Sequence, residues 1–450
     1  MRKLLTFCIT ISLFACKEES KIDYTLFSGK IENPTDKLVT VYHGREKVKE
    51  ISLTDDGTFA DTLKVKSGYY TINHGREGSA MYLNPGDDIK VFIDTKEFDE
   101  TIAYTGTGSE NSNFLAAKFL AEEKFDLNYA ELFAMEENDF LARMDEIKSS
   151  KVEFLKASQS ISNELRGLED KHIEYEYLGN LLNYKSYHSY YAKKEEFTPS
   201  KEFMEIFETV NFGNKTDYET LDSYKRLVQG YYTNKIGDSD NPSEIFNEIN
   251  DMDFPLLKED LAGSLRYNIG PNNEHNEAYF NGIIAMSTDK KFKENITAKY
   301  NKIKKLAKGM PSPKFEEYEN HKGGTTSLKD LKGKYVYMDV WATWCGPCIR
   351  EIPSLKKIEE QYHGKNIAFV STSIDKAKDH NTWVEMVKNK ELGGVQLMAD
   401  NDWNSQFIKD YAIEGIPRFI LIDPDGNIVS ADAPRPSNPK LVKMLEELKI

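Results

Sequence analysis

Cysteine is scarce in this chain, and histidine is scattered. Only four cysteines occur in 450 residues, and two of them, Cys8 and Cys16, lie near the N-terminus, outside any predicted folded region. The eight histidines form no His-x-x-x-His or His/Cys group. A structural zinc ion needs four ligands, commonly two cysteine pairs or cysteine and histidine together. We therefore expect no metal site, and we expect no other cofactor.

An excess of positive charge is also missing. The 59 lysines and arginines are outnumbered by 74 aspartates and glutamates, which gives a formal net charge of −15. Phosphate backbones and anionic lipid headgroups attract basic surfaces. Nucleic acid and anionic lipid surfaces are therefore not expected partners.

No apolar run is long enough to cross a membrane. Arg2 and Lys3 precede an apolar segment from Leu4 to Ala15, which is about 12 residues long, whereas a membrane-spanning helix needs about 20. This pattern is typical of an export signal. The segment Leu13-Phe14-Ala15-Cys16 resembles the lipobox of bacterial lipoproteins, which implies cleavage before Cys16 and lipidation of that cysteine. An ordinary signal peptide with an incidental cysteine is the alternative.

The lipobox resemblance sets the expected location. It implies a signal peptide at residues 1–15 and a lipidated tether at residues 16–23. Lys17 takes the place of the Asp that favours inner-membrane retention in the lipoprotein family, so we expect the cell envelope, on the outer membrane facing the periplasm. Lys17-Glu18-Glu19 also resembles a tract that sends some lipoproteins to the outer surface, although a solvated tether explains the same residues.

The length predicts about three domains, and the first is rich in strands. Residues 24–108 contain short alternating runs such as Leu38–Tyr42 and Ile89–Ile93, separated by turns rich in Gly, Asn and Pro. This pattern predicts a small β-sandwich, and the order of its motifs resembles an uncharacterised β-rich domain found before thioredoxin-like domains in exported lipoproteins. We interpret Gly106-Thr107-Gly108 as a linker that closes the domain.

Residues 109–309 form an all-α middle region according to their apolar spacing. Apolar residues recur every three or four positions, as expected for amphipathic helices. Four tyrosines follow one helical stripe, and packing in the core explains the stripe better than a groove for an extended polypeptide. The four are Tyr177, Tyr184, Tyr187 and Tyr191.

The last region, residues 310–450, alternates predicted strands and helices. Its order is typical of an α/β domain with a partly parallel sheet. Strands are expected at 334–341, 366–373, 395–398, 418–422 and 428–430, and helices at 347–362, 381–390, 403–411 and 438–448.

The most informative motif is Cys345-Gly346-Pro347-Cys348, at the junction of the first strand and first helix of this region. Such a pair can bind zinc, form a structural disulfide or act as a dithiol catalyst. After cleavage of the signal and lipidation of Cys16, Cys345 and Cys348 would be the only free thiols. They could then pair only with each other or with a substrate.

The motif, the position of Pro417 and the element order together resemble the thioredoxin superfamily. The closer resemblance is to the TlpA/ResA-like branch of exported thiol–disulfide oxidoreductases, and it covers about the last 140 residues. It implies a redox-active disulfide between Cys345 and Cys348, with Cys345 as nucleophile at a helix N-terminus and Cys348 as the resolving thiol.

The resemblance also implies the surrounding roles. Asp339 matches the buried acid of thioredoxin, and Glu351 matches an active-site acid of the ResA-like proteins, so both are candidates for handling the proton of Cys348. A salt-bridged strand residue and a surface glutamate are their respective alternatives. Ile416 and Pro417 should form a cis peptide that pairs with substrate, and Trp344 should form an exposed rim beside Cys345.

The predicted function is therefore an extracytoplasmic thiol–disulfide oxidoreductase that reduces disulfides of exported proteins. Its expected partners are those proteins, an upstream membrane thiol reductant and, through the lipid anchor, the membrane. Two alternatives stay open. One is a net disulfide oxidase or isomerase on the same fold, and the other is a partner-binding lipoprotein in which the redox domain is accessory.

Overall fold

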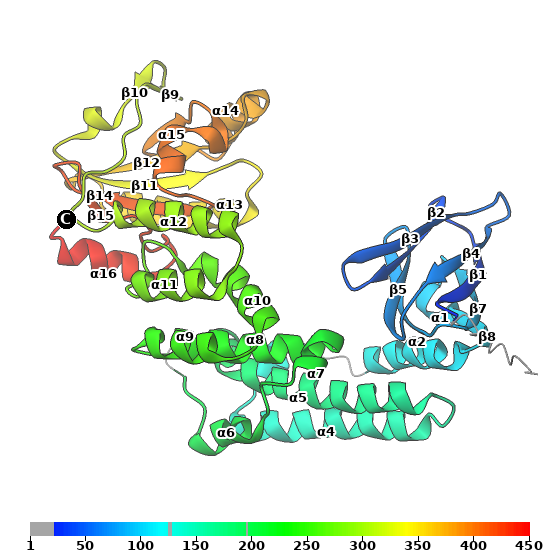
Figure 1. Ribbon diagram of the computed structural model, residues 1–450. Helices are drawn as coiled ribbons and strands as arrows, with labels where there is room; N and C mark the ends of the chain where they lie inside the picture. Colours follow the sequence, from blue (N-terminus) through cyan, green and yellow to red (C-terminus); the bar gives the residue numbers. More distant parts are fainter. Residues whose placement is uncertain (1–21, 125–127, 195–196) are drawn as a thin grey trace, which may run out of the picture. The chain divides into compact units, whose positions relative to one another are not determined.

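The computed structural model describes residues 22–124, 128–194 and 197–450 (Figure 1). The chain divides into two compact units, with the division in the sequence between Tyr231 and Tyr232. This division lies inside the predicted helical domain 109–309, so helices belong to both units. The predicted signal peptide and the lipidation site Cys16 lie outside the described residues.

The first unit begins with the expected β-sandwich. Its two four-stranded sheets have the orders β4-β1-β7-β8 and β3-β2-β5-β6, and β1 pairs parallel with β7 although the two are far apart in sequence. Side chains of both sheets, such as Phe27 and Val41, belong to one hydrophobic core. The strands are β1 Tyr24–Glu32, β2 Leu38–His43, β3 Glu46–Ser52, β4 Thr58–Lys64, β5 Gly68–His74, β6 Glu77–Leu83, β7 Asp88–Asp94 and β8 Ala103–Thr107, with a short helix α1 Phe98–Thr101.

The interpretation of Gly106-Thr107-Gly108 as a linker is wrong. Gly106 and Thr107 belong to β8, and Gly108 is the N-cap of helix α2. At Gly106 the backbone has φ 97° and passes so close to Asp88 that a Cβ would lie 2.0 Å from its carbonyl oxygen. Glycine is required there by a close approach of two strands, which is a contact that the local sequence does not reveal.

Helices complete the first unit, and the tyrosine stripe lies on the longest of them. Tyr184 is fully buried in the helical core, and its hydroxyl donates to the carbonyl oxygen of Met135 at 2.7 Å. Tyr187 and Tyr191 remain about two-fifths exposed, at 42% and 37%. The elements are α2 Ser109–Glu123, α3 Tyr129–Ala134, α4 Glu137–Ala157, α5 Asn163–Tyr191, α6 Lys201–Glu205, η1 Ile206–Thr209, α7 Lys215–Thr220 and α8 Asp222–Gly237, which ends in the second unit.

The second unit contains the remaining helices of the middle region and the C-terminal α/β domain. The helices are α9 Pro242–Asp251, α10 Pro255–Leu265, η2 Arg266–Asn268, α11 Asn276–Met286 and α12 Lys290–Lys304. Phe246 of α9 packs edge-on against Tyr279 of α11, at 5.3 Å between ring centroids, and Gly282 of α11 leaves the room that this ring occupies.

A seven-stranded sheet forms the centre of the C-terminal domain. Its order is β10-β9-β13-β12-β11-β14-β15, in which β11, β12 and β13 run parallel and β14 runs antiparallel to β11. The strands are β9 Tyr318–Asn320, β10 Thr325–Thr326, β11 Tyr335–Trp341, β12 Ile367–Ser373, β13 Val395–Met398, β14 Arg418–Ile422 and β15 Ile428–Ser430. The helices are η3 Leu328–Leu331, α13 Gly346–Gln361, η4 Ala377–Asp379, α14 His380–Asn389, η5 Asp402–Asn404, α15 Gln406–Asp410 and α16 Pro439–Glu447.

One face of this sheet is covered by α13 and α16. Leu355 and Ile358 of α13 and Leu441 and Leu445 of α16 share a hydrophobic core with side chains of β11, β12 and β14. A central parallel pair, an antiparallel hairpin beside it and a helix that starts at the end of the central strand make this domain thioredoxin-like, as the sequence predicted. The predicted fold class is confirmed: β sheets come first, helices follow, and a thioredoxin-like α/β domain comes last. The number of domains and their boundaries stay predictions.

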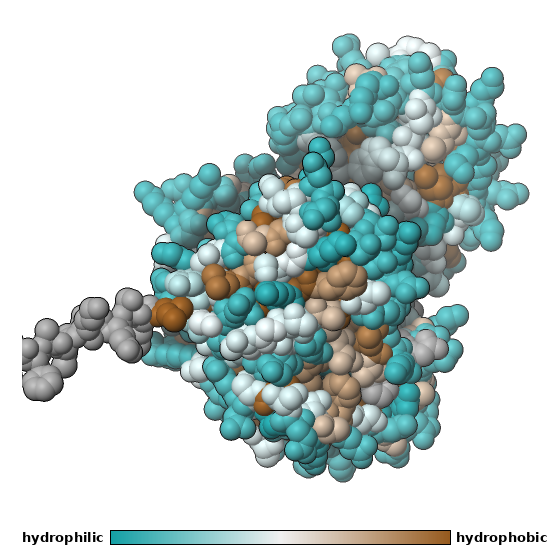
Figure 2. Space-filling model, turned by 90° about the vertical axis from the view of Figure 1, so that its right-hand side faces the viewer, coloured by the Kyte–Doolittle hydropathy of each residue, from teal (hydrophilic) through white to brown (hydrophobic). Residues whose placement is uncertain are grey.

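Figure 2 shows hydrophilic residues over most of the visible face, with apolar residues scattered between them. Among the described residues, no helix is both long enough and apolar enough to cross a bilayer.

Candidate active site

The Cys345–Cys348 pair lies where β11 passes into α13. Six of the seven residues of β11 are buried, and the strand ends at Trp341. After a three-residue turn, Cys345 takes extended dihedrals (φ −83°, ψ 94°) and becomes the N-cap of α13. Its Sγ accepts a hydrogen bond from the backbone N–H of Cys348 at 3.2 Å, and Pro347 lies in the first turn, where its missing N–H costs nothing.

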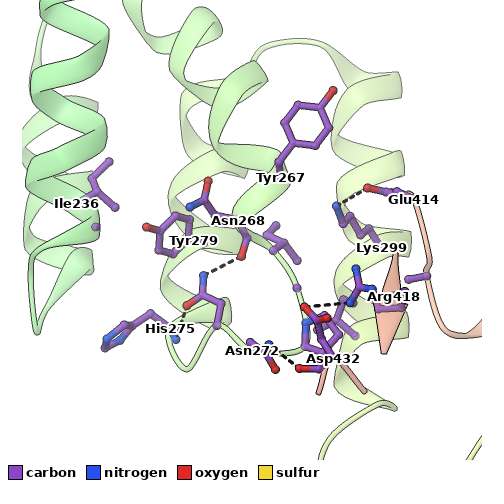
Figure 3. Close-up of a pocket in the computed structure, with 17 residues that line it drawn as sticks. Ile236, Tyr267, Asn268, Asn272, His275, Tyr279, Lys299, Glu414, Arg418 and Asp432 are labelled. Carbon is purple, nitrogen blue, oxygen red and sulfur yellow. Dashed lines mark hydrogen bonds and ion pairs between the residues drawn. The ribbon is translucent and has the colours of Figure 1, made fainter. Parts of the chain in front are cut away.

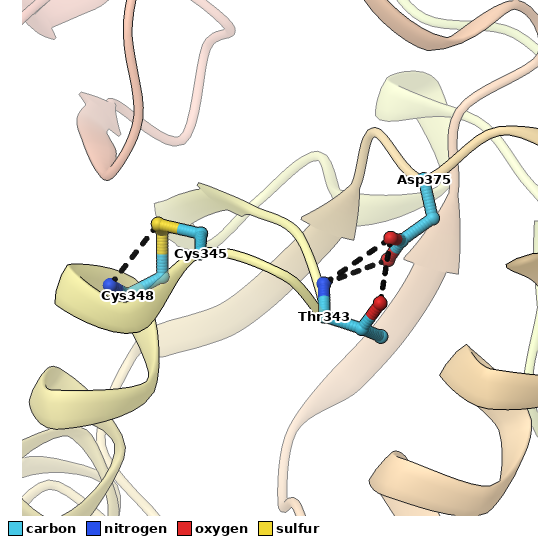
Figure 4. The surroundings of a disulfide bond; sticks show 4 residues. All are labelled: Thr343, Cys345, Cys348 and Asp375. Atoms are coloured by element: carbon cyan, nitrogen blue, oxygen red, sulfur yellow. Dashed lines mark hydrogen bonds between the residues drawn. A yellow bond between two sulfur atoms is a disulfide. The ribbon is translucent and has the colours of Figure 1, made fainter. Parts of the chain in front are cut away.

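The two cysteines form a disulfide (Figure 4). Both are nearly buried, with 4% of Cys345 and 3% of Cys348 exposed, whereas the preceding Trp344 is 59% exposed. Trp344 therefore gives the predicted exposed apolar surface directly beside the disulfide. In the reduced protein, a thiolate on Cys345 would keep the N–H donor and face the positive end of the α13 dipole, and both favour the negative charge.

A buried carboxylate that the sequence analysis missed fixes the turn before Cys345. Asp375 lies two residues after the end of β12 and is 1% exposed. Its carboxylate accepts hydrogen bonds from the backbone N–H of Thr343 at 2.9 Å and from the Thr343 hydroxyl at 2.7 Å (Figure 4). The Ser373 hydroxyl donates to the same carboxylate at 2.6 Å. The sequence held only one signal for Asp375. It is an acidic residue just after the predicted strand 366–373, which was expected to lie beside the strand that leads to Cys345.

Replacing Asp375 with asparagine should loosen this turn. Asparagine has a single acceptor oxygen, whereas both oxygens of the carboxylate accept hydrogen bonds. A buried group left without its hydrogen bond destabilises the folded turn by roughly 2 kcal/mol. The free energy of local opening falls by the same amount, which makes amide exchange about thirtyfold faster. We expect this increase at Thr343, measured by hydrogen exchange. Asp425→Asn, in an exposed turn of the same domain, is the control. Unchanged exchange at Thr343 would show that the carboxylate does not fix the turn.

Asp339 is buried in the middle of the sheet. It lies on β11 opposite Ser371 of β12 and Phe419 of β14, and only 8% of it is exposed. Burial, together with the nearby carboxylates of Glu351 and Glu359, raises the pKa of its carboxyl from 3.8 to about 8, and burial is the largest cause. No ion pair within 4.0 Å is found for Asp339 among the described residues, which argues against the alternative of a salt-bridged strand residue.

Glu351 is buried on α13, not exposed as a surface glutamate would be. Its two carboxylate oxygens accept hydrogen bonds from Ser437, one from the backbone N–H at 3.0 Å and one from the hydroxyl at 2.8 Å. This contact ties α13 to the segment before α16. The structure therefore gives Glu351 a clear structural contact, while its part in proton transfer stays a prediction.

The peptide bond between Ile416 and Pro417 is cis, as expected. Pro417 directly precedes β14, whose first residue, Arg418, pairs with Val340 near the end of β11. Because β11 leads from this end to Cys345, the sheet register places the cis-proline segment at the same edge of the sheet as the disulfide. Substrate contact by these residues stays a prediction.

A separate polar cavity of about 490 Å³ lies between the helices and the α/β domain of the second unit (Figure 3). Its charged groups are paired with one another. Lys299 of α12 contacts Glu414 at 2.9 Å, and Arg418 contacts Asp432 at 3.2 Å. The cavity does not include the disulfide, and its ion pairs and the hydrogen bond from Asn272 to the carbonyl oxygen of Asp432 join the helices to the domain. Within the described residues, no group of three or more His, Cys, Asp or Glu side chains could hold a metal ion.

Three features define a thioredoxin-superfamily domain. A cysteine pair lies where the central strand passes into a helix, a buried acid lies on that strand, and a cis-proline lies at the same edge of the sheet. The Redoxin family model matches residues 307–445. The thiol–disulfide oxidoreductase ResA of a Bacillus cereus strain is 30% identical over 125 residues, which are 28% of this chain and 69% of the relative. ResA of Bacillus subtilis (strain 168) is 27% identical over 124 residues, 28% of this chain and 66% of that protein.

Solved structures give matches over the same part of the chain. The thioredoxin domain of a thiol–disulfide oxidoreductase from Bacteroides vulgatus is 30% identical, covers 32% of this chain and 98% of its own, and has a TM-score of 0.29. One from Bacteroides fragilis is 29% identical, covers 31% of this chain and 98% of its own, and has a TM-score of 0.27. On the sequence relationships, the chain belongs to the TlpA/ResA-like thiol–disulfide oxidoreductases of the thioredoxin superfamily.

Proposed function

We propose that this protein reduces disulfide bonds of exported proteins through Cys345 and Cys348. The observation that supports this most directly is their position, since the disulfide caps α13 and lies beside a tryptophan with 59% of its surface exposed. An apolar exposed side chain next to a reactive sulfur suits docking of a partly unfolded polypeptide. In this proposal Trp344, Ile416 and Pro417 contact the substrate.

The reaction uses both sulfurs in turn. The Cys345 thiolate attacks one sulfur of the substrate disulfide, the substrate S–S bond breaks, and the released substrate thiolate takes a proton from solvent. A mixed disulfide then joins Cys345 to the substrate. The Cys348 thiolate attacks Cys345 Sγ and releases the second substrate thiolate. Two electrons pass from the protein dithiol to the substrate, and the protein is left with the Cys345–Cys348 disulfide.

Asp339 handles the proton of Cys348 in this scheme. The Cys348 thiol must lose its proton before it can attack, and a carboxylate with a pKa of about 8 is matched to accept a proton near neutral pH. Glu351 adds negative charge that raises the pKa of Asp339. Proton handling is thus assigned to Asp339, with Glu351 as the candidate that tunes it.

The oxidised pair must be reduced again after each cycle. Two electrons are needed, and we propose that a membrane thiol reductant supplies them by the same exchange chemistry. The sequence at the N-terminus supports a lipid anchor on Cys16, which would hold the protein on the outer membrane facing the periplasm. Both parts of this proposal rest on the sequence pattern.

The reduction potential of the Cys345–Cys348 pair tests the direction of electron flow. We expect a value near that of thioredoxin, about −270 mV, in equilibrium with dithiothreitol or glutathione buffers. A value near −120 mV would overturn the reductant proposal in favour of an oxidase, because the 150 mV between the two corresponds to roughly 10⁵-fold in the exchange equilibrium. Cys345→Ser, which cannot form the disulfide, is the control for signal from other groups.

A further inference from the structure

A small cavity lies under α13, beside Asp339. Its volume is about 10 Å³, which is room for about one water molecule. Three buried polar atoms belong to the residues that line it: Asp339 Oδ1, Trp341 Nε1 and Gln396 Oε1. None of the three has a hydrogen-bond partner among the described protein atoms. One donor and two acceptors are the set that a single water molecule can satisfy with three hydrogen bonds.

The Glu359 carboxylate reaches the same cavity from the last turn of α13, and a pair of glycines makes room for it. A Cβ on Gly393 would lie 2.2 Å from Glu359 Oε2, and a Cβ on Gly394 would lie 3.1 Å from Oε1. The Nε2 of Gln396 donates to the carbonyl oxygen of Gly393 at 2.7 Å. The loop before β13 therefore holds both the carboxylate and the amide whose free oxygen belongs to the cavity.

The charges around the two acids favour a shared proton. Burial raises the pKa of Glu359, while Lys356 on α13 and Lys322 in the β9–β10 turn lower it. Asp339 is faced by Glu351 and Glu359, which raise its pKa, and no lysine is among the groups that act on it. The more exposed acid is thus the one that carries compensating positive charge nearby. A proton that reaches Glu359 can pass to solvent, because this side chain is only partly buried.

We propose that Asp339, a bound water and Glu359 form a proton-transfer chain that links Cys348 to solvent on the side of α13 away from the disulfide. The inference rests on the proposed function of Asp339. The Cys348 thiol gives its proton to the Asp339 carboxylate, Asp339 gives a proton to the water, and the water gives one to Glu359, which releases it to solvent. No electrons move in these steps, and each group returns to its starting state.

The position of Glu359 explains why such a proton-transfer chain would be useful: it ends far from the surface that the substrate covers. Glu359 lies 11 residues after Cys348 on α13, about 16 Å along a helix that rises 1.5 Å per residue. In the mixed disulfide, a bound polypeptide covers the surface around Trp344 and Cys345. A path that ends beside Gly393 lets the Cys348 proton leave while the substrate is still attached.

Two variants of the full-length protein test the chain. Glu359→Gln removes the acid, and Gly393→Ala keeps it but displaces its carboxylate. The backbone of Gly393 is not in the left-handed region, so alanine can adopt its conformation. The atom that the new Cβ would meet is the end of the flexible Glu359 side chain, which can move away. Glu360→Gln, an exposed neighbour on α13, is the matched control. The measured step is oxidation of the reduced protein by a saturating concentration of a disulfide-bonded polypeptide that contains no tryptophan. The reaction is monitored by the tryptophan fluorescence of the protein, from pH 6 to 9 in dilute buffer.

We expect both variants to slow the concentration-independent resolution step by about tenfold, a part of the usual general acid–base contribution. The slowed step should show a larger solvent deuterium isotope effect, and added imidazole should restore its rate. Removing the Glu359 charge also lowers the pKa of Asp339, so rates are compared at equal ionisation of Asp339, read from the pH profile. A normal rate in either variant, or no rescue by imidazole, would overturn the chain.

The proposed function fails in a different way. If Asp339→Asn leaves the resolution rate and its pH profile unchanged, Asp339 does not handle the proton, whatever Glu359 does. A crystal structure of the protein adds a direct measurement of the water. We expect it within hydrogen-bond distance of Asp339 Oδ1, Trp341 Nε1 and Gln396 Oε1, and a dry cavity would also overturn the chain.

Discussion

Replacing Cys348 with serine is expected to turn the transient mixed disulfide into an isolable complex. Without the second sulfur, the bond between Cys345 and the substrate can no longer be resolved within the protein. Reduced Cys348→Ser protein mixed with a disulfide-bearing protein should give a covalent adduct on a non-reducing gel. Mass spectrometry should place the link at Cys345, and dithiothreitol should release it.

The reciprocal variant gives the control. Cys345→Ser should form no adduct, because Cys348 lies inside the first turn of α13 and is only 3% exposed. Exposure alone does not separate the two sulfurs in the disulfide, since Cys345 is 4% exposed, so the assignment depends on the N-cap position and the neighbouring Trp344. An adduct with Cys345→Ser and none with Cys348→Ser would reverse the assignment of the nucleophile.

The single substitution Asp339→Asn should have two effects: it should stabilise the C-terminal domain, and it should slow the redox cycle. The pKa of Asp339 is raised from 3.8 to about 8 in the folded protein, so the folded state binds the proton more tightly than the unfolded state. The stability that comes with this proton is complete below about pH 4 and is lost as the pH rises to about 8. At pH 7 the folded protein has lost at most about 4 kcal/mol of stability relative to low pH through this one group. Asparagine cannot ionise, so the variant should recover a part of that loss.

The measurement is selective because all four tryptophans, at positions 341, 344, 383 and 403, lie in this domain. Urea unfolding followed by tryptophan fluorescence should show a gain in stability for Asp339→Asn that grows from pH 5 to pH 8. Resolution of the mixed disulfide should slow by about a hundredfold and lose its dependence on a group with an apparent pKa near 8. Asp425→Asn should change neither quantity. A stability gain that is the same at pH 4 and pH 8 would show that the pKa of the Asp339 carboxyl is not raised in the folded protein.

The sequence allowed good prediction where local signals decide the structure. In the α/β domain, the predicted strands 395–398, 418–422 and 428–430 have the observed bounds, because glycine, proline and asparagine turns separate short β-branched runs. Strands β9 and β10 were missed, since three and two residues are too few to show a period. The site residues on β11 and α13 were predicted from one motif and its resemblance to a family.

Contacts between distant segments were beyond the sequence. The Thr343–Asp375 hydrogen bonds join two strand ends, and the approach of Glu359 to Gly393 joins a helix to a loop. In the β-sandwich, the parallel pairing of β1 with β7 depends on the packing of the whole domain. The division at Tyr231 also has no mark in composition, because helices continue on both sides of it.

The segment before the α/β domain limits how this protein can be cut into fragments. The N–H of Gly309 donates to the carbonyl oxygen of Ile428 at 2.7 Å, and Ile428 donates in turn to Met310 at 2.8 Å, so a fragment that starts at Met310 would begin inside a hydrogen-bonded edge. It would also leave Glu414 without Lys299. A fragment that starts at Asn241 would retain α9 to α12 and these contacts, and is the better design for studying the redox site alone.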